Sequence, residues 1–198
     1  MPDLAGSVHL QLSTLLLDAE GRLTERIQAG RTLRAALLVD LVGAGALRND
    51  PDSIEIVPTA GLLPLAARML GDMTAEPDRD LIWWAHHDHL SVEDAAGQMV
   101  DLGLWHRSEH AWGLEHRYAW RDDRSELATA LRAAVGPDYD RADSGLVGPN
   151  LALVGGLWGR PPRPPEDDVI AALGQDNWIV PELIDYLWRS AAQLRLVR

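Results

Sequence analysis

The sequence predicts a mainly α-helical, compact domain that carries two β-hairpins. Apolar residues recur at three- and four-residue spacing over several segments, which is typical of amphipathic helices. Twice such a segment ends at glycine and is followed by two short alternating strands, a winged-helix-like helix–hairpin order. The 198 residues, 46% of them hydrophobic, are enough for one core. We therefore expect a single domain over 1–198, with 165–198 as a C-terminal helical extension.

Each expected element has its own signal in the chain. Asp40 interrupts the apolar row of the first long helix, and Gly45 and Gly103 mark two helix ends. Ser91 followed by Asp94 forms an approximate capping box. In order, we expect a short helix or strand at 8–17, helices at 32–47 and 62–73, a helix or only its first turns at 80–90, and a helix at 91–103. Hairpins are expected at 46–61 and 106–120, helices at 124–136 and 151–159, and two more in 167–198, the last from about Pro181.

Composition and charge exclude several classes of function. The chain has no cysteine, so disulfides, thiolate metal sites and cysteine nucleophiles are excluded. The net charge of −12 opposes binding to nucleic acid, because phosphate neutralisation supplies most non-specific affinity. The sequence contains no run of about 18 apolar residues, so it predicts no membrane-spanning segment. Asp3 stands where a signal peptide would carry positive charge, so we expect a cytoplasmic protein.

The stretch LIWWAHHDHL, residues 81–90, contains the densest group of chemically active side chains. Its imidazoles and carboxylate are competent ligands for zinc or a similar ion. In a helix His86 and His89 would share one face and His87 would point about 100° away. No recognised zinc spacing is present. A metal-dependent enzyme using the cluster from His86 to His89 is therefore an alternative function, and we assign no metal ligands.

The order of segments resembles the Golgi-phosphoprotein-3-like family over residues 8–158. The resemblance lies in a leucine-rich opening with LLLDAEGRL, the helix LRAALLVDLVGAGAL with its hairpin, and the helix end MVDLGLW with a second hairpin. It implies a non-enzymatic peripheral membrane adaptor without a cofactor, which binds phosphatidylinositol 4-phosphate. The implied partners are an anionic phospholipid at the inner face of the membrane, and a protein partner or further copies of the chain.

The resemblance also implies a head-group site. Relatives hold the phosphate with a tryptophan before the first long helix, an arginine inside it, and two arginines before the second hairpin. Arg34 matches the first arginine, whereas the later two positions hold His89 and Val92. A histidine in place of an arginine predicts binding that is favoured by acid. The expected ligand-binding residues are Arg31, Arg34, His89 and Trp84.

The second hairpin is the expected surface for membrane or oligomer contact. Relatives use this hairpin for membrane insertion or self-association, and the residues expected to act here are Trp112, Leu114, Tyr118 and Trp120. Charged neighbours such as Glu109 and Arg117 disfavour insertion and leave an oligomer contact open.

Two further hypotheses stay open at this point. The helix–hairpin order also suits a winged-helix module for nucleic acid or protein, although residues 92–102 carry no basic stripe. Alternatively, Arg31 and Arg34 pair with neighbouring carboxylates as an ordinary solvated face. No phosphate loop, dinucleotide fingerprint or nucleophile elbow is present, so no catalytic residue is assigned.

Overall fold

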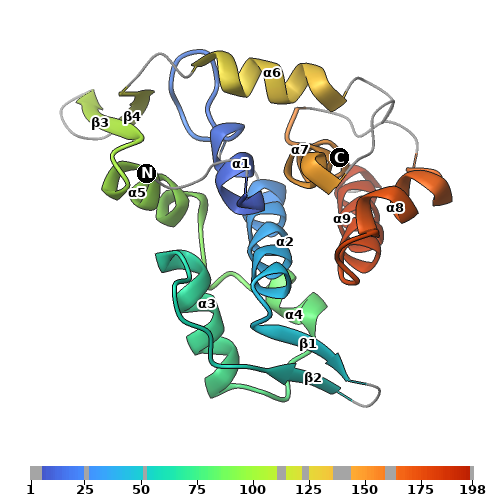
Figure 1. Ribbon diagram of the computed structural model, residues 1–198. Coiled ribbons are helices and arrows are strands. Elements are labelled where there is room, and N and C mark those ends of the chain that lie inside the picture. The colour runs from blue at the N-terminus through green and yellow to red at the C-terminus, as the bar shows by residue number, and fades with distance from the viewer. Residues whose placement is uncertain are drawn as a thin grey trace.

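Helix α2 (Ile27–Gly43) is the centre of the fold, and other helices pack around it (Figure 1). Its residues from 32 to 39 are all buried, as expected of a helix that is apolar on every side. The computed structural model describes residues 6–24, 27–50, 53–110, 115–121, 125–135, 144–158 and 164–196. The helices in contact with α2 are α1 (Val8–Thr14), α3 (Pro64–Ala75), α4 (Leu81–His86), α5 (Val92–Asp101), α7 (Val147–Val154) and α9 (Val180–Leu196).

Two antiparallel hairpins follow two of these helices. Strand β1 (Leu47–Asp50) pairs with β2 (Ser53–Ile56) directly after α2. Strand β3 (Trp105–His110) pairs with β4 (Glu115–Trp120) directly after α5. The predicted class, mainly helical with two hairpins in helix–hairpin order, is confirmed.

The two helix–hairpin junctions share one backbone geometry. Gly45 and Gly103 both have φ of 71°, in the left-handed region that disfavours a β-carbon. At each junction the residue after the glycine donates to the carbonyl oxygen five positions earlier, at 2.9 Å. This is the Schellman arrangement that ends a helix. The similar segments LVDLVGAGAL and MVDLGLW therefore both form a helix C-terminus of this type.

Some predicted helix boundaries are wrong by about a turn. Helix α2 begins at Ile27 rather than at residue 32, and its polar first turn contacts α9 through Gln28 and Arg31. Helix α4 ends at His86, so residues 80–90 form only the first turns of a helix, one of the two expected alternatives. Hydrogen bonds from Arg34 hold the segment after His86, and local spacing does not report them.

The C-terminal helices belong to the same core as the rest of the chain. Helix α9 contributes Leu183, Ile184 and Leu187 to the main apolar cluster, although the sequence suggested an extension. Helix α8 (Asp167–Gly174) packs on α9, and α6 (Ser125–Val135) packs on α7 (Figure 1). Of the helices that the structure describes, none is long and apolar enough to cross a membrane.

Candidate functional site

A cleft of about 650 Å³ lies between the start of α2, the end of α4 and the start of α5. We call it the arginine cleft. It brings together two predicted ligand-binding residues and three neighbours from the histidine-rich stretch. Its charged and titratable lining residues are Arg31, Arg34, His86, His87, Asp88 and Glu93.

Arg34 is the most buried charged residue of this cleft, with 2% of its surface exposed. Its guanidinium projects from the middle of α2 towards the segment that follows α4. It donates to the carbonyl oxygens of Ala85 at 3.0 Å, His86 at 3.1 Å and Leu90 at 2.7 Å, and to Oδ1 of Asp88 at 3.2 Å.

These bonds use four of the five N–H donors of the Arg34 guanidinium. Burial lowers the pKa of Arg34, and the nearby carboxylate of Asp88 opposes that shift. The close packing favours glycine at position 30, because a β-carbon there would lie 3.1 Å from Nη1 of Arg34. Arg34 therefore holds the end of α4 in place and is largely unavailable to a ligand.

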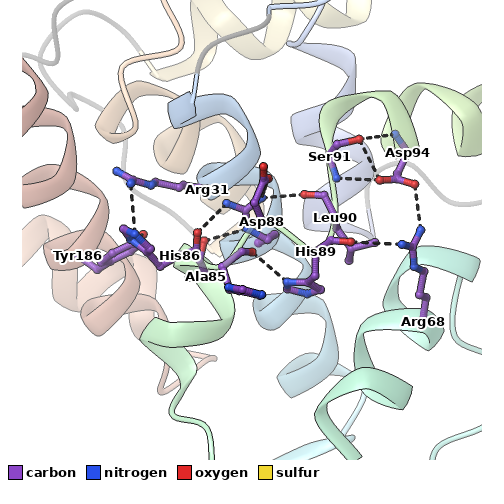
Figure 2. Close-up of polar contacts among 12 residues, drawn as sticks. Arg31, Arg68, Ala85, His86, Asp88, His89, Leu90, Ser91, Asp94 and Tyr186 are labelled. Atoms are coloured by element: carbon purple, nitrogen blue, oxygen red, sulfur yellow. Dashed lines mark hydrogen bonds and ion pairs between the residues drawn. The ribbon is translucent and has the colours of Figure 1, made fainter. Parts of the chain in front are cut away.

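Arg31 lies one turn earlier in α2 and joins α4 to α9 (Figure 2). Its Nη1 donates to the hydroxyl of Ser190, and its Nη2 lies 3.4 Å from Nε2 of His86. His86 in turn places Nδ1 at 3.0 Å from the hydroxyl of Tyr186. Since a guanidinium only donates, Nε2 of His86 accepts, and its Nδ1 carries the proton. The buried Nε of Arg31 has no hydrogen-bond partner among the described residues.

The surroundings of His86 lower its pKa and so favour its neutral form. Partial burial is the largest cause that lowers the pKa of His86, followed by the charges of Arg31 and Arg34. A second cleft of about 490 Å³ lies between α4 and α9, and Arg31 and His86 line it as well. Arg31 and His86 therefore line both clefts, and their contact lies where the two clefts adjoin.

His89 lies outside the arginine cleft, unlike the sequence-based expectation. Because α4 ends at His86 and His87 is extended, with ψ of 136°, the predicted shared helix face of His86 and His89 is wrong. The ring of His89 lies edge-on to Trp84 at 5.0 Å, and its Nδ1 lies 2.9 Å from the carbonyl oxygen of His87. Burial lowers the pKa of His89. The histidine that lines the cleft with the two arginines and contacts Arg31 is His86.

Trp84 is a core residue and does not line the arginine cleft. Only 2% of its surface is exposed, and it belongs to the main apolar cluster. Trp83 is half-buried and stacks on His87 at 4.2 Å, with the guanidinium of Arg79 on its ring at 4.5 Å. Of the four predicted ligand-binding residues, the structure thus places Arg31 and Arg34 in the cleft and His89 and Trp84 beside it.

A hydrogen-bonded capping box holds the start of α5 against α3. Ser91 and Asp94 form both reciprocal bonds of the box, and Arg68 donates to Asp94 at 2.9 Å (Figure 2). Burial raises the pKa of Asp94, but the bonds from Ser91 and Arg68 outweigh it and lower the pKa. The predicted capping box is confirmed, and it fixes the wall of the cleft that carries Glu93.

The second hairpin turns its described aromatic residues inward. Tyr118 is 6% exposed and packs on Trp105, whose centroid lies 5.8 Å away. Trp120 is half-buried and lies edge-on to the same indole at 6.0 Å. Trp112 and Leu114 lie outside the described residues. Tyr118 and Trp120 are thus packing residues of a small core under the hairpin.

Within the described ranges, no three His, Asp or Glu side chains are arranged to hold a metal ion. The rings of His87 and His89 are nearly parallel, at an angle of 17° with centroids 6.2 Å apart. The histidine-rich stretch thus contributes His86, His87 and Asp88 to the arginine cleft, and His87 stacks on Trp83 and His89.

Sequence reasoning missed a buried polar network around His9 and Asp40. His9 is 1% exposed, and its Nδ1 contacts Oδ2 of Asp40. Asp40 also accepts from the backbone N–H of Val8 at 2.7 Å and from the hydroxyl of Ser7 at 3.0 Å. Nε2 of His9 lies 2.7 Å from Nε2 of Gln98. The sequence contained one sign of this buried network, because Asp40 interrupts the apolar row of the first long helix.

This network has a structural explanation. The carboxylate of Asp40 satisfies the first backbone donors of α1, which a helix otherwise leaves unpaired. It thereby anchors α1 on α2, and Gln98 extends the network to α5. Although a cleft of about 500 Å³ passes beside Asp40, both ring nitrogens of His9 are engaged within the fold.

No family model, curated protein or solved structure matches the chain. The resemblance to the Golgi-phosphoprotein-3-like family thus stays a prediction from the order of its segments.

Proposed function

We propose that the protein is a non-enzymatic binding protein that holds the phosphate of a phospholipid head group at Arg31, in the arginine cleft. In this proposal it attaches peripherally to a membrane, as the resemblance to Golgi-phosphoprotein-3-like proteins implies. The observation that carries the proposal is the buried Nε of Arg31, which has no partner among the described residues and belongs to a residue that lines the open cleft. A buried donor without a partner costs about 1–3 kcal/mol, which an incoming acceptor recovers.

The two arginines have different roles in this proposal. Arg31 binds the ligand, because its Nε is unpartnered among the described residues. Arg34 is a positioning residue, because its donors hold the backbone that shapes the cleft. Charge-assisted hydrogen bonds from a guanidinium to phosphate are among the stronger polar contacts in proteins.

His86 adds a dependence on pH to the proposed site. Its neutral ring accepts from Arg31, and its pKa is lowered by burial and by the two arginines. A bound anion would favour the protonated ring, since an opposite charge stabilises the imidazolium. We therefore expect tighter binding at pH 6.0 than at pH 7.5.

Liposome flotation tests the proposal. Vesicles of phosphatidylcholine with and without an anionic phospholipid are compared at pH 6.0 and pH 7.5. We expect flotation with the anionic lipid, stronger at pH 6.0, and its loss in Arg31→Gln. The matched control is Arg48→Gln, which removes the same charge from an exposed arginine on β1. Absence of flotation at both pH values, or equal flotation of Arg31→Gln and the wild type, would contradict the proposal.

A further inference from the structure

The arginine cleft carries both signs of charge. Its lining holds two guanidinium groups, Arg31 and Arg34, and two carboxylates, Asp88 and Glu93. With His86 neutral these four charges cancel. The carboxylate of Asp88 forms an ion pair with buried Arg34 at 3.2 Å. Glu93 makes no ion pair with any described residue. The cleft is therefore neutral overall, and the buried Nε of its Arg31 has no partner among the described residues.

This balance disfavours a head group with several phosphates. Each phosphate needs its own set of fixed donors, best supplied by further arginines. In the arginine cleft a second phosphate would meet Asp88 or Glu93, and like charges disfavour that contact. A ligand with one phosphate and one cationic group would instead meet a complementary charge at both ends.

The two carboxylates are open to such a cation. The side chain of Asp88 is 90% exposed, and only its Oδ1 is bonded to Arg34. Glu93 is exposed in the first turn of α5. An ionised carboxylate accepts several hydrogen bonds, so both side chains have acceptor capacity for an ammonium group.

An apolar residue stands at the same opening. Ile27 is 66% exposed, the exposed large hydrophobic side chain of the described part of the chain, and it lines the arginine cleft. It offers an apolar surface where the glycerol and acyl parts of a lipid would continue beyond its head group.

We propose that the arginine cleft selects a zwitterionic phosphodiester with a primary amine, the chemistry of an ethanolamine phosphate head group. The phosphodiester accepts from Arg31, and the ammonium donates to Glu93 and Asp88. This inference rests on the proposed function of Arg31 and narrows it to one ligand class.

Titration calorimetry with two soluble diesters tests the selection. The probes are sn-glycero-3-phosphoethanolamine and sn-glycero-3-phosphoglycerol, which carry the same phosphodiester and differ in the amine. We expect the amine-bearing diester to bind about three- to tenfold more tightly. Glu93→Gln should reduce that preference about two- to fivefold, the range expected for one exposed ion pair. Asp101→Asn is the matched control, because it removes a charge from the far end of the same helix, away from the cleft.

The outcomes separate this inference from the function on which it rests. Equal binding of both diesters, abolished by Arg31→Gln, would overturn the amine selectivity and leave the proposed function standing. Failure of both diesters and of inorganic phosphate to bind would overturn both. Flotation on vesicles with phosphatidylethanolamine would identify a membrane head group as the source, whereas binding of the soluble diester without flotation would identify a free metabolite and contradict the membrane attachment proposed above. An unchanged preference in Glu93→Gln would also contradict the inference.

Discussion

Nη1 of Arg34 donates a 2.7 Å hydrogen bond to the carbonyl oxygen of Leu90, 56 positions further along the chain. With the bonds to Ala85 and His86, it makes the central helix the support for the turn between α4 and α5. At the end of the six-residue helix α4 the buried guanidinium adds to the local bond from the backbone N–H of His87 to the carbonyl oxygen of Trp83. The shape of the arginine cleft follows from this contact.

Arg34→Met should destabilise the fold by about 3–5 kcal/mol, because it leaves the buried carbonyl oxygens of Ala85 and Leu90 and the partly buried one of His86 without their donor. Urea denaturation followed by circular dichroism measures the change. Arg31→Gln is the comparison, since Arg31 is only partly buried and holds no backbone carbonyl, and it should cost less than about 1.5 kcal/mol. Equal losses for the two variants would contradict the division of roles between positioning and binding.

Gly103→Ala should destabilise the protein by about 1–2 kcal/mol, because alanine in the left-handed region places its β-carbon against the following carbonyl. No atom lies within 4 Å of the added carbon, so the backbone conformation is the main cause.

Gly97→Ala supplies the control within the same helix. It also meets no atom within 4 Å, but lies in the helical interior, where alanine should stabilise by about 0.5–1 kcal/mol. Thermal melts of both variants should therefore shift in opposite directions. A shift of the same sign would contradict the Schellman assignment.

His89 should make the stability of the fold depend on pH. Burial lowers its pKa below the ordinary value of 6.5, so the unfolded chain binds this proton more readily than the native chain. Its stabilising contribution is therefore complete above pH 6.5 and is lost as the pH falls below that value. Denaturation midpoints at pH 7.5 and pH 5.5 should differ less in His89→Gln than in the wild type. His116→Gln, at an exposed position of β4, should keep the wild-type difference.

The sequence predicts the elements of this fold well because their signals are local. Apolar spacing, the Ser91–Asp94 capping box and the two glycine stops each act within a few residues. The end of α4 carries no such signal. Its carbonyls are bound by Arg34 from another helix, so the pattern through Leu90 looked helical.

The candidate site was predictable in part for the same reason. Arg31 and Arg34 share a face of one helix, and that spacing places both in the cleft. The choice between His86 and His89 depends on where α4 ends, which is a tertiary property. Arg31 and Ser190 lie on helices far apart in the chain, so local sequence patterns do not predict their contact.

The central claim is that Arg31 binds an anion while Arg34 supports the cleft, and side-chain nuclear magnetic resonance tests it most directly. The Nε–H signals of both arginines are assigned with Arg31→Gln and Arg34→Lys and followed during titration with inorganic phosphate. We predict that the Arg31 signal shifts in a saturable way, while the Arg34 signal, bonded to the carbonyl of Ala85, stays in place. A saturable shift of Arg34 alone, or no shift of either signal, would contradict the account.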